Sequence, residues 1–183
     1  MTAPVNPRHD PARRDRIIDA CLDVIVAHGV AGTSARRVAT EAGVPLGSVS
    51  YHFEGMDDLL HEALRRFADS VADRLTARLT AATTPAEARA AVAETIDADM
   101  FVAHRELVLT TELYTLAARE PRYRALTHGW MTRTRTALER HFDPVTARLL
   151  DAMVEGLTLH AALDVEPADP AVARAALERL IPG

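Results

Sequence analysis

Hydrophobic residues along this chain recur at the spacing of amphipathic helices. The pattern is clearest in residues 12–28 and 56–80, where apolar side chains return every three or four positions and share one helical face. The two faces consist of Ile18, Cys21, Leu22 and Ile25, and of Leu60, Leu64, Phe67, Val71, Leu75 and Leu79. Runs of the β-branched and aromatic residues that strands favour are short. The pattern predicts an all-α protein.

Capping and turn residues divide the chain into about nine predicted helices. Gly29 and Gly43 stand where a helix C-terminus favours glycine. Asp143-Pro144 and Asp169-Pro170 each join a capping side chain to a proline suited to the first helical turn. The predicted helices span residues 12–28, 34–41, 45–52, 56–80, 85–102, 104–118, 122–141, 144–163 and 170–181.

Composition supports the helical interpretation and excludes several classes of protein. Of 183 residues, 34 are alanine, and all 21 cationic side chains are arginine; both types favour helices. No apolar run approaches the roughly 18 residues of a membrane span. The proline-containing start, residues 1–11, is predicted to be a flexible arm and lacks the apolar region of a secretory signal. The single cysteine, Cys21, excludes an internal disulfide. From these three observations together we expect a cytoplasmic protein without a membrane partner.

The net charge does not by itself suggest a nucleic-acid partner. The chain carries a formal charge of −5, whereas nucleic-acid-binding domains are usually basic. Residues 1–53 hold six arginines and five acidic residues, and residues 54–183 hold fifteen arginines and twenty-one acidic residues. This difference in charge is too small to indicate a binding partner, so the partner has to be inferred from sequence motifs.

The most informative stretch is the pair of short helices predicted between residues 34 and 52. Thr33 or Ser34 can cap the first helix, and Pro45 suits the first turn of the second. Two helices that cross steeply through a short turn need a small residue, a turn glycine and apolar residues that close a shared core. The residues at these positions are Ala39, Gly43, Val38, Val44 and Val49. This spacing predicts a helix-turn-helix, whose second helix enters the DNA major groove.

The outward positions of the second short helix are small or polar rather than charged. Small side chains let a helix approach base edges, and hydroxyl groups can bond bases or phosphates. Leu46 can contact a thymine methyl group, and Arg36 or Arg37 can reach a guanine or a phosphate. The predicted outward residues are Pro45, Leu46, Gly47, Ser48, Ser50, Tyr51 and His52. The alternative for each of them is plain solvent exposure.

Several local motifs accompany this helix pair. His28-Gly29-Val30 ends the first helix, Gly32-Thr33-Ser34 opens the second, and the run from Gly47 to Phe53 precedes a helix that contains Leu59-Leu60. With these motifs, residues 13–64 resemble the DNA-binding domain of the TetR family of bacterial transcriptional regulators. The resemblance implies an N-terminal helix-turn-helix head and a C-terminal helical bundle that binds an effector and dimerises.

The resemblance also implies a division of the chain and a set of DNA contacts. The parts are an arm at 1–11, a DNA-binding domain at 12–55, and an effector-binding and dimerisation domain at 56–183 that helix 56–80 links to the head. The implied contacts comprise the outward residues of the recognition helix and the start of the preceding helix. At that start they are Thr33, Ser34, Arg36 and Arg37.

Two positions depart from the family pattern. Ser50 stands where the family often has a tyrosine, and Met56 stands where it commonly has a lysine. Both changes remove a group that contacts the DNA backbone. We expect weaker, more salt-sensitive DNA binding unless Arg8, Arg13 and Arg14 compensate.

Members of the family are homodimers on palindromic operators, and the resemblance implies a repressor that a small effector releases. Helix 144–163 is apolar on more than one face, and Gly156 in its middle costs about 1 kcal/mol, which close approach of another helix would explain. The predicted interface residues are Leu149, Met153, Gly156, Leu157, Leu177 and Leu180. The predicted pocket residues are Met100, Phe101, His104, Leu107, Thr111, Tyr114, Trp130, Met131 and His160, which favour an apolar or aromatic effector over a highly charged one.

Catalytic and metal-binding motifs are incomplete. His61-Glu62-Ala63-Leu64-Arg65 lacks the second histidine of a zinc motif, and the eight histidines show no ligand spacing. We therefore predict no enzyme, no catalytic residue, no cofactor and no metal. A metal-sensing regulator stays open, as does a ligand-binding helical protein whose DNA-binding head is weakened or depends on a corepressor. The sequence does not separate a repressor from an activator.

Overall fold

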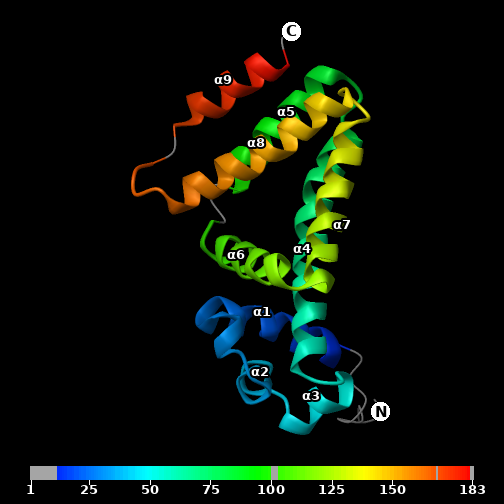
Figure 1. The fold of residues 1–183 in the computed structure, drawn as a ribbon, viewed down its shortest axis with the longest axis vertical. Helices are drawn as coiled ribbons and strands as arrows, with labels where there is room; N and C mark the ends of the chain where they lie inside the picture. Colours follow the sequence, from blue (N-terminus) through cyan, green and yellow to red (C-terminus); the bar gives the residue numbers. More distant parts are fainter. Residues whose placement is uncertain (1–11, 100–102, 168, 182–183) are drawn as a thin grey trace, which may run out of the picture. The chain divides into compact units, whose positions relative to one another are not determined.

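The computed structural model describes residues 12–99, 103–167 and 169–181, and its regular structure is entirely α-helical. Figure 1 shows the order of the helices in these ranges. They are α1 (Arg13–Gly32), α2 (Ala35–Glu41), α3 (Leu46–His52), α4 (Met56–Ala81), α5 (Pro85–Asp99), α6 (Ala103–Arg119), α7 (Pro121–Leu138), α8 (Pro144–Leu163) and α9 (Pro170–Leu180). The prediction of an all-α protein is confirmed.

Helix boundaries follow the predicted capping residues. The side chain of Ser34 accepts a hydrogen bond from the Arg37 amide at the start of α2. Asp143 and Asp169 cap α8 and α9 in the same way, each followed by a proline in the first turn. Pro45 differs from the prediction because it is the N-cap of α3 rather than its first helical residue.

Helix α1 ends at Gly32 instead of the predicted 28, and Gly29 inside it has non-helical dihedral angles. Helix α7 ends at Leu138 instead of the predicted 141. The amides of His141 and Phe142 both donate to the Leu138 carbonyl, at 2.9 and 3.0 Å, so the backbone turns there. At its other end α7 begins with Pro121, because a proline that ends one helix is also suited to the first turn of the next.

The chain divides into two compact units, Met1–Phe67 and Ala68–Gly183, and α4 contributes to both. In the first unit α1 packs on α2, and α2 packs on α3. Ile17 and Ile25 of α1 and Leu64 of α4 are fully buried in its core. The assignment of functions to residues 12–55 and 56–183 stays a prediction.

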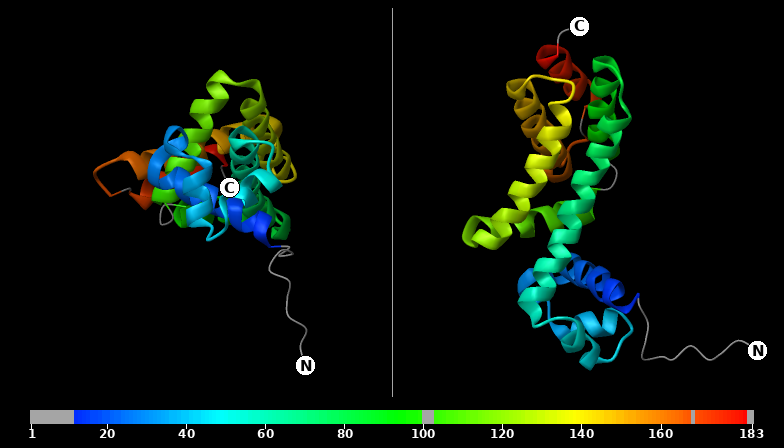
Figure 2. Two further views of the ribbon diagram at one scale, coloured as in Figure 1. Left: turned by 90° about the horizontal axis from the view of Figure 1, so that it is seen from below. Right: turned by 90° about the vertical axis from the view of Figure 1, so that its right-hand side faces the viewer.

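In the second unit α8 packs against α5, α6, α7 and α9, and α9 packs against α5. The right-hand view in Figure 2 shows α9, in red, beside α5 and α8. A core cluster joins Leu79 of α4, Val92 of α5, Leu138 of α7 and Leu150 of α8. No helix in the described ranges is long and apolar enough to cross a membrane.

Candidate functional site

The turn between α2 and α3 has the geometry of a helix-turn-helix. Gly43 adopts a positive φ of 62°, a conformation that other residues avoid, and the Val44 amide donates to the Ala39 carbonyl at 3.0 Å. Val38, Ala39 and Val49 are buried between the helices, while Val44 is half-buried. The small residue, the turn glycine and the closing valines thus meet the predicted requirements.

One face of α3 is presented to solvent. Tyr51 is 84% exposed and Leu46 is 50% exposed, which is unusual for large apolar side chains. Gly47 and Ser50 lie between them and are also exposed. These four residues, at positions i, i+1, i+4 and i+5, form a continuous strip that we call the α3 face. Pro45 is exposed just before the helix, and His52 is half-buried behind the face.

Ser48 does not belong to the α3 face, and the prediction that it points outward is wrong. Only 9% of its surface is exposed. The sequence placed only Val49 on the buried side of α3, but in the structure this side also includes Ser48. Ser48 and Val49 both turn inward, and Phe53, four residues after Val49, is buried behind them.

At the start of α2, three of the four predicted contact residues are engaged in local hydrogen bonds. The Thr33 hydroxyl donates to the Gly29 carbonyl at 2.8 Å, and Ser34 caps the helix. The Arg37 guanidinium donates to the Gly32 carbonyl. Arg36 is exposed, and its guanidinium makes no hydrogen bond or ion pair within the described ranges, so it is available to a phosphate.

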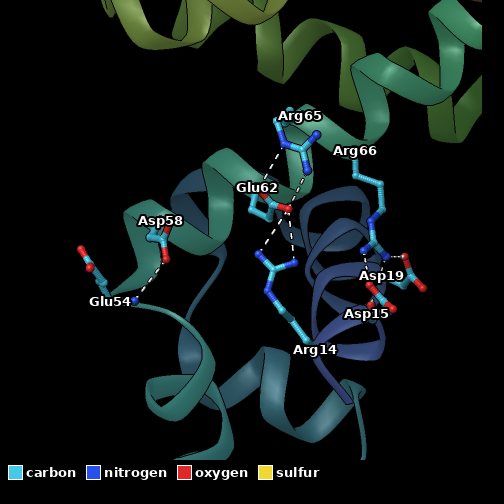
Figure 3. Close-up of polar contacts among 8 residues, drawn as sticks. All are labelled: Arg14, Asp15, Asp19, Glu54, Asp58, Glu62, Arg65 and Arg66. Atoms are coloured by element: carbon cyan, nitrogen blue, oxygen red, sulfur yellow. Dashed lines mark hydrogen bonds and ion pairs between the residues drawn. The ribbon is translucent and has the colours of Figure 1, made fainter. Parts of the chain in front are cut away.

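Arginines behind the helix-turn-helix are held by carboxylates, as Figure 3 shows. Glu62 of α4 binds Arg14 of α1 at 3.3 Å and Arg65 at 2.7 Å. The hydrogen bond from Arg65, with that from Arg14, lowers the pKa of Glu62 to about 2. Arg14 also lies 5.2 Å from the centre of the Phe53 ring. Arg14, expected to compensate for missing DNA contacts, is therefore already paired, and Arg8 lies outside the described residues.

A second group in Figure 3 pairs Arg66 of α4 with Asp15 and Asp19 of α1. Sequence reasoning missed these links, because the partners stand 51 and 47 positions apart. Only the ion pair between Glu62 and Arg65 could have been predicted from the sequence, since residues three apart are neighbours on a helix. The described residues contain no group of three His, Cys, Asp or Glu side chains that could hold a metal ion.

The second unit contains a cavity of about 100 Å³, which we call the central cavity, lined by α4, α5, α6, α7 and α8. Three predicted residues line it: Leu107, Trp130 and Met131. Tyr114 lies at its border, where its hydroxyl donates to Glu155 at 2.5 Å and its ring centre is 6.1 Å from that of Trp130. The other lining residues are Val71, Arg74, Leu75, Thr95, Glu106, Thr110, Thr134, Asp151, Val154, Glu155, Thr158, Leu159 and Ala162.

Three other predicted pocket residues are exposed and do not line the central cavity, which corrects that expectation. His104 and Thr111 of α6 are exposed and are not among the residues that line the cavity. On α8, positions 151, 154, 155, 158 and 159 face the cavity, and His160 is turned to solvent. Met100 and Phe101 lie outside the described residues.

The lining is more polar than predicted, and most of its charges are paired. Arg74 of α4 binds Glu106 of α6 at 2.8 Å, and Arg135 binds Asp151 at 2.7 Å. Burial raises the pKa of Asp151 even though Arg135 opposes the shift. Burial and the neighbouring Glu155 raise the pKa of Tyr114.

Sequence reasoning missed the acidic part of this lining. A signal existed on α8, because Asp151, Glu155 and Thr158 recur at helical spacing within an otherwise apolar segment. Among the described residues, the Glu155 carboxylate has the Tyr114 hydroxyl as its only polar partner, so its charge is the one that no cation balances.

The predicted interface residues fall into three groups. Leu149 is 49% exposed, and it shares α8 with two further exposed residues, Val145 and Leu163. Met153, Gly156, Leu157 and Leu180 are half-buried. The prediction for Leu177 is wrong, because this residue is 2% exposed and packs in the core of its own chain.

Taken together, the fold and these two sites define a DNA-binding regulator with a helix-turn-helix head and a helical ligand-binding domain. Two family models match the chain. The model of the tetR family of bacterial regulatory proteins matches residues 17–63, and that of the tetracyclin repressor-like C-terminal domain matches residues 83–183. The chain belongs to the TetR family of transcriptional regulators, whose members are DNA-binding regulators rather than enzymes.

Several known proteins are similar over most of their length. A crystal structure of the transcriptional regulator SCO7518 from Streptomyces coelicolor A3(2) is 52% identical, with a TM-score of 0.85, and covers 94% of this chain and 100% of that one. The multidrug binding protein EbrR, solved with ethidium, is 38% identical, with a TM-score of 0.76 and coverages of 93% and 99%. The regulator BetI 1 of Chromohalobacter salexigens is 30% identical over 84% of this chain and 80% of its own.

Proposed function

We propose that this protein is a homodimeric repressor that binds a two-fold symmetric operator and is released by an aromatic cation. The observation that carries the DNA-binding part is the α3 face, because a strip of exposed small and polar residues on a recognition helix suits close approach to bases. Tyr51 supplies a ring and a hydroxyl group that stand clear of the protein, being 84% exposed. The unpaired Arg36 supplies a cation for the adjacent phosphates.

The dimer is supported by apolar surface on α8. Val145 and Leu163 are 69% and 65% exposed, and Leu149 lies on the same helix. Gly156 has nothing of its own chain within 4 Å of the place where a Cβ would stand. A glycine that costs about 1 kcal/mol in a helix, with open space beside it, suits close approach by a second chain. Two-fold symmetry would then place two α3 faces on two half-sites of DNA.

The effector class follows from the charges around the central cavity. Glu106 and Asp151 are neutralised by arginines, whereas Glu155 is balanced by none. The rings of Tyr114 and Trp130 lie beside Glu155, and aromatic faces attract cations. The related EbrR has been solved with ethidium, malachite green and proflavin, all of them aromatic cations. These observations favour a cationic aromatic effector, whereas the sequence favoured an apolar or aromatic effector over a highly charged one.

Coupling to DNA follows from the size of the central cavity. Its volume of about 100 Å³ is below the roughly 300 Å³ at which drug-sized pockets begin, so an aromatic effector must push the lining apart. A cation that enters also competes with Arg74 of α4 for Glu106. Because α4 extends into both compact units, a shift of α4 is a means by which effector binding can disfavour the DNA-bound state.

The test is selection of binding sites by the purified protein from a random pool of duplex DNA, without added ligand. We expect one palindromic sequence to be enriched, and ethidium to release the protein from that sequence in a gel-shift assay. The Tyr51→Ala variant is the matched control and should enrich nothing. If the folded wild-type protein also enriches nothing, the head does not read DNA unaided, and the chain is a ligand-binding protein or needs a corepressor.

A further inference from the structure

The second unit also contains a groove between α5 and α9 that is larger than the central cavity. Its volume is about 670 Å³, within the roughly 300–1,000 Å³ of small-molecule sites. Small side chains create the space, since alanines of both helices form much of the floor. Leu177 and Ile181 complete an apolar surface along α9.

The groove differs from the central cavity in its charge. Arg89 of α5 and Arg174 of α9 are the only ionisable side chains among the described residues that line it, and none of these residues carries a carboxylate. Arg174 is exposed, and its side chain has no hydrogen bond or ion pair within the described ranges. Arg89 makes one long contact, 3.5 Å, to the Ile181 carbonyl. Two uncompensated cations in one groove stand out in a chain whose net charge is −5.

Nearby acidic residues do not neutralise the groove. Glu87 accepts hydrogen bonds from the amide and the hydroxyl of Thr83, at 2.7 and 2.8 Å, at the start of α5. Glu94 and Glu178 are exposed and do not line the groove. The arginines are therefore free to hold an anion that enters from solvent.

The groove lies on α5 and α9, whereas the surface proposed for dimerisation lies on α8. Ala173, Leu177 and Ile181, at helical spacing, face the groove. Val172 is 52% exposed and does not line it. A second chain on α8 and on the Val172 side of α9 leaves the groove open.

We propose that this groove is a second ligand site, specific for an amphipathic monocarboxylate. The apolar body of the ligand lies on the floor that includes Ala93 and Leu177, and its carboxylate is bound by Arg174 and Arg89. A hydrophilic anion such as phosphate does not use the floor, and a neutral hydrocarbon leaves two arginines unpaired. The site is independent of the central cavity and of DNA binding.

The experiment is isothermal titration of the full-length protein with sodium decanoate, and with decan-1-ol as the uncharged probe of equal length. We expect one decanoate per chain and much weaker binding of the alcohol. Arg174→Gln should weaken decanoate binding at least about tenfold, as expected when a charge-assisted hydrogen bond is lost. Arg119→Gln removes an exposed arginine at the end of α6, outside the groove, and should change nothing.

Two further variants distinguish the groove from other sites. Ala90→Trp fills the groove and should abolish binding, whereas Leu107→Trp fills the central cavity and should not. Equal affinities in wild type, Arg174→Gln and Arg89→Gln would overturn the proposal, and so would loss of binding in Leu107→Trp alone. Because Arg174 is exposed, its substitution tests the site without disturbing the core. No DNA enters the assay, so failure here would leave the proposed regulatory function untouched.

Discussion

Replacing Glu155 with glutamine separates recognition of charge from recognition of shape in the central cavity. Glutamine has nearly the same shape as glutamate, and its amide oxygen can still accept the hydrogen bond from the Tyr114 hydroxyl. The substitution therefore removes one negative charge and leaves the packing of α6 against α8 in place. Affinity for an aromatic cation should fall, while affinity for a neutral aromatic molecule of similar size should not.

The size of the effect follows from how the other charges are paired. Glu106 and Asp151 are bound to arginines at 2.8 and 2.7 Å, so Glu155 supplies the attraction for an incoming cation. Two unit charges 4 Å apart attract by about 4 kcal/mol at an effective dielectric constant of about 20. Desolvation of both partners offsets part of this, and hydrogen bonds to charged groups are worth about 1.5–3 kcal/mol net. The expected loss in affinity is roughly 10- to 150-fold.

The protein carries its own reporter for this measurement. Trp130 is the only tryptophan in the chain, and it lines the central cavity. Quenching of its fluorescence by ethidium gives the affinity of wild type and of Glu155→Gln, and the neutral probe is phenanthridine. Glu178→Gln, which removes an exposed carboxylate of α9 outside the cavity, is the control for a general loss of negative charge.

Two results would refute the reasoning. If Glu155→Gln binds ethidium as tightly as wild type does, the charge of Glu155 does not select the effector. If ethidium and phenanthridine lose affinity equally, the substitution has altered the shape of the cavity, and the effector class must be argued from packing instead. An equal loss in Glu178→Gln would point to the overall charge of the protein.

Three further predictions concern the head and the proposed interface. Tyr51→Ala should reduce operator affinity at least about tenfold in a gel shift without lowering the melting temperature, because the ring is 84% exposed; unchanged affinity would place the DNA surface elsewhere. The pKa of Glu62 is lowered from 4.5 to about 2, so its contribution to stability is present above pH 4.5 and lost as the pH falls towards 2. Glu62→Gln should therefore cost about 1 kcal/mol in denaturant unfolding at pH 7 and less at pH 3, and an equal cost at both would contradict this assignment. Leu149→Arg should give folded monomers in sedimentation, whereas Leu177→Arg should unfold the chain because Leu177 is 2% exposed; a dimeric Leu149→Arg variant would move the interface.

Features encoded within a few residues were predictable from the sequence. Ser34 and Asp143 cap their helices as expected, because a side-chain oxygen before a helix binds amides two or three residues ahead. Gly43 has the positive φ that its place after α2 indicated. The helix-turn-helix is a short structure built from such local rules, which is why its position followed from spacing alone.

Features that depend on distant packing were not predictable in the same way. The bond between Arg14 and Glu62 joins residues 48 positions apart, and no periodicity links them. Ser48 illustrates a smaller failure of the same kind. Helical spacing gives the order of residues around α3, but the breadth of its buried side depends on how closely α3 packs into the head.

Helix α8 explains why the central cavity was harder to predict than the head. Sequence reasoning found it apolar on several faces and assigned that surface to a dimer interface. In the structure its faces divide: Leu150 enters the core, Asp151 and Glu155 line the cavity, and Val145 and Leu149 remain exposed. Which face meets which neighbour depends on the angles at which α5, α6, α7 and α9 cross α8, and one sequence does not specify these angles. A polar stripe on an otherwise apolar helix is therefore the better guide to a ligand site in such bundles, because buried carboxylates are costly unless a partner or a ligand balances them.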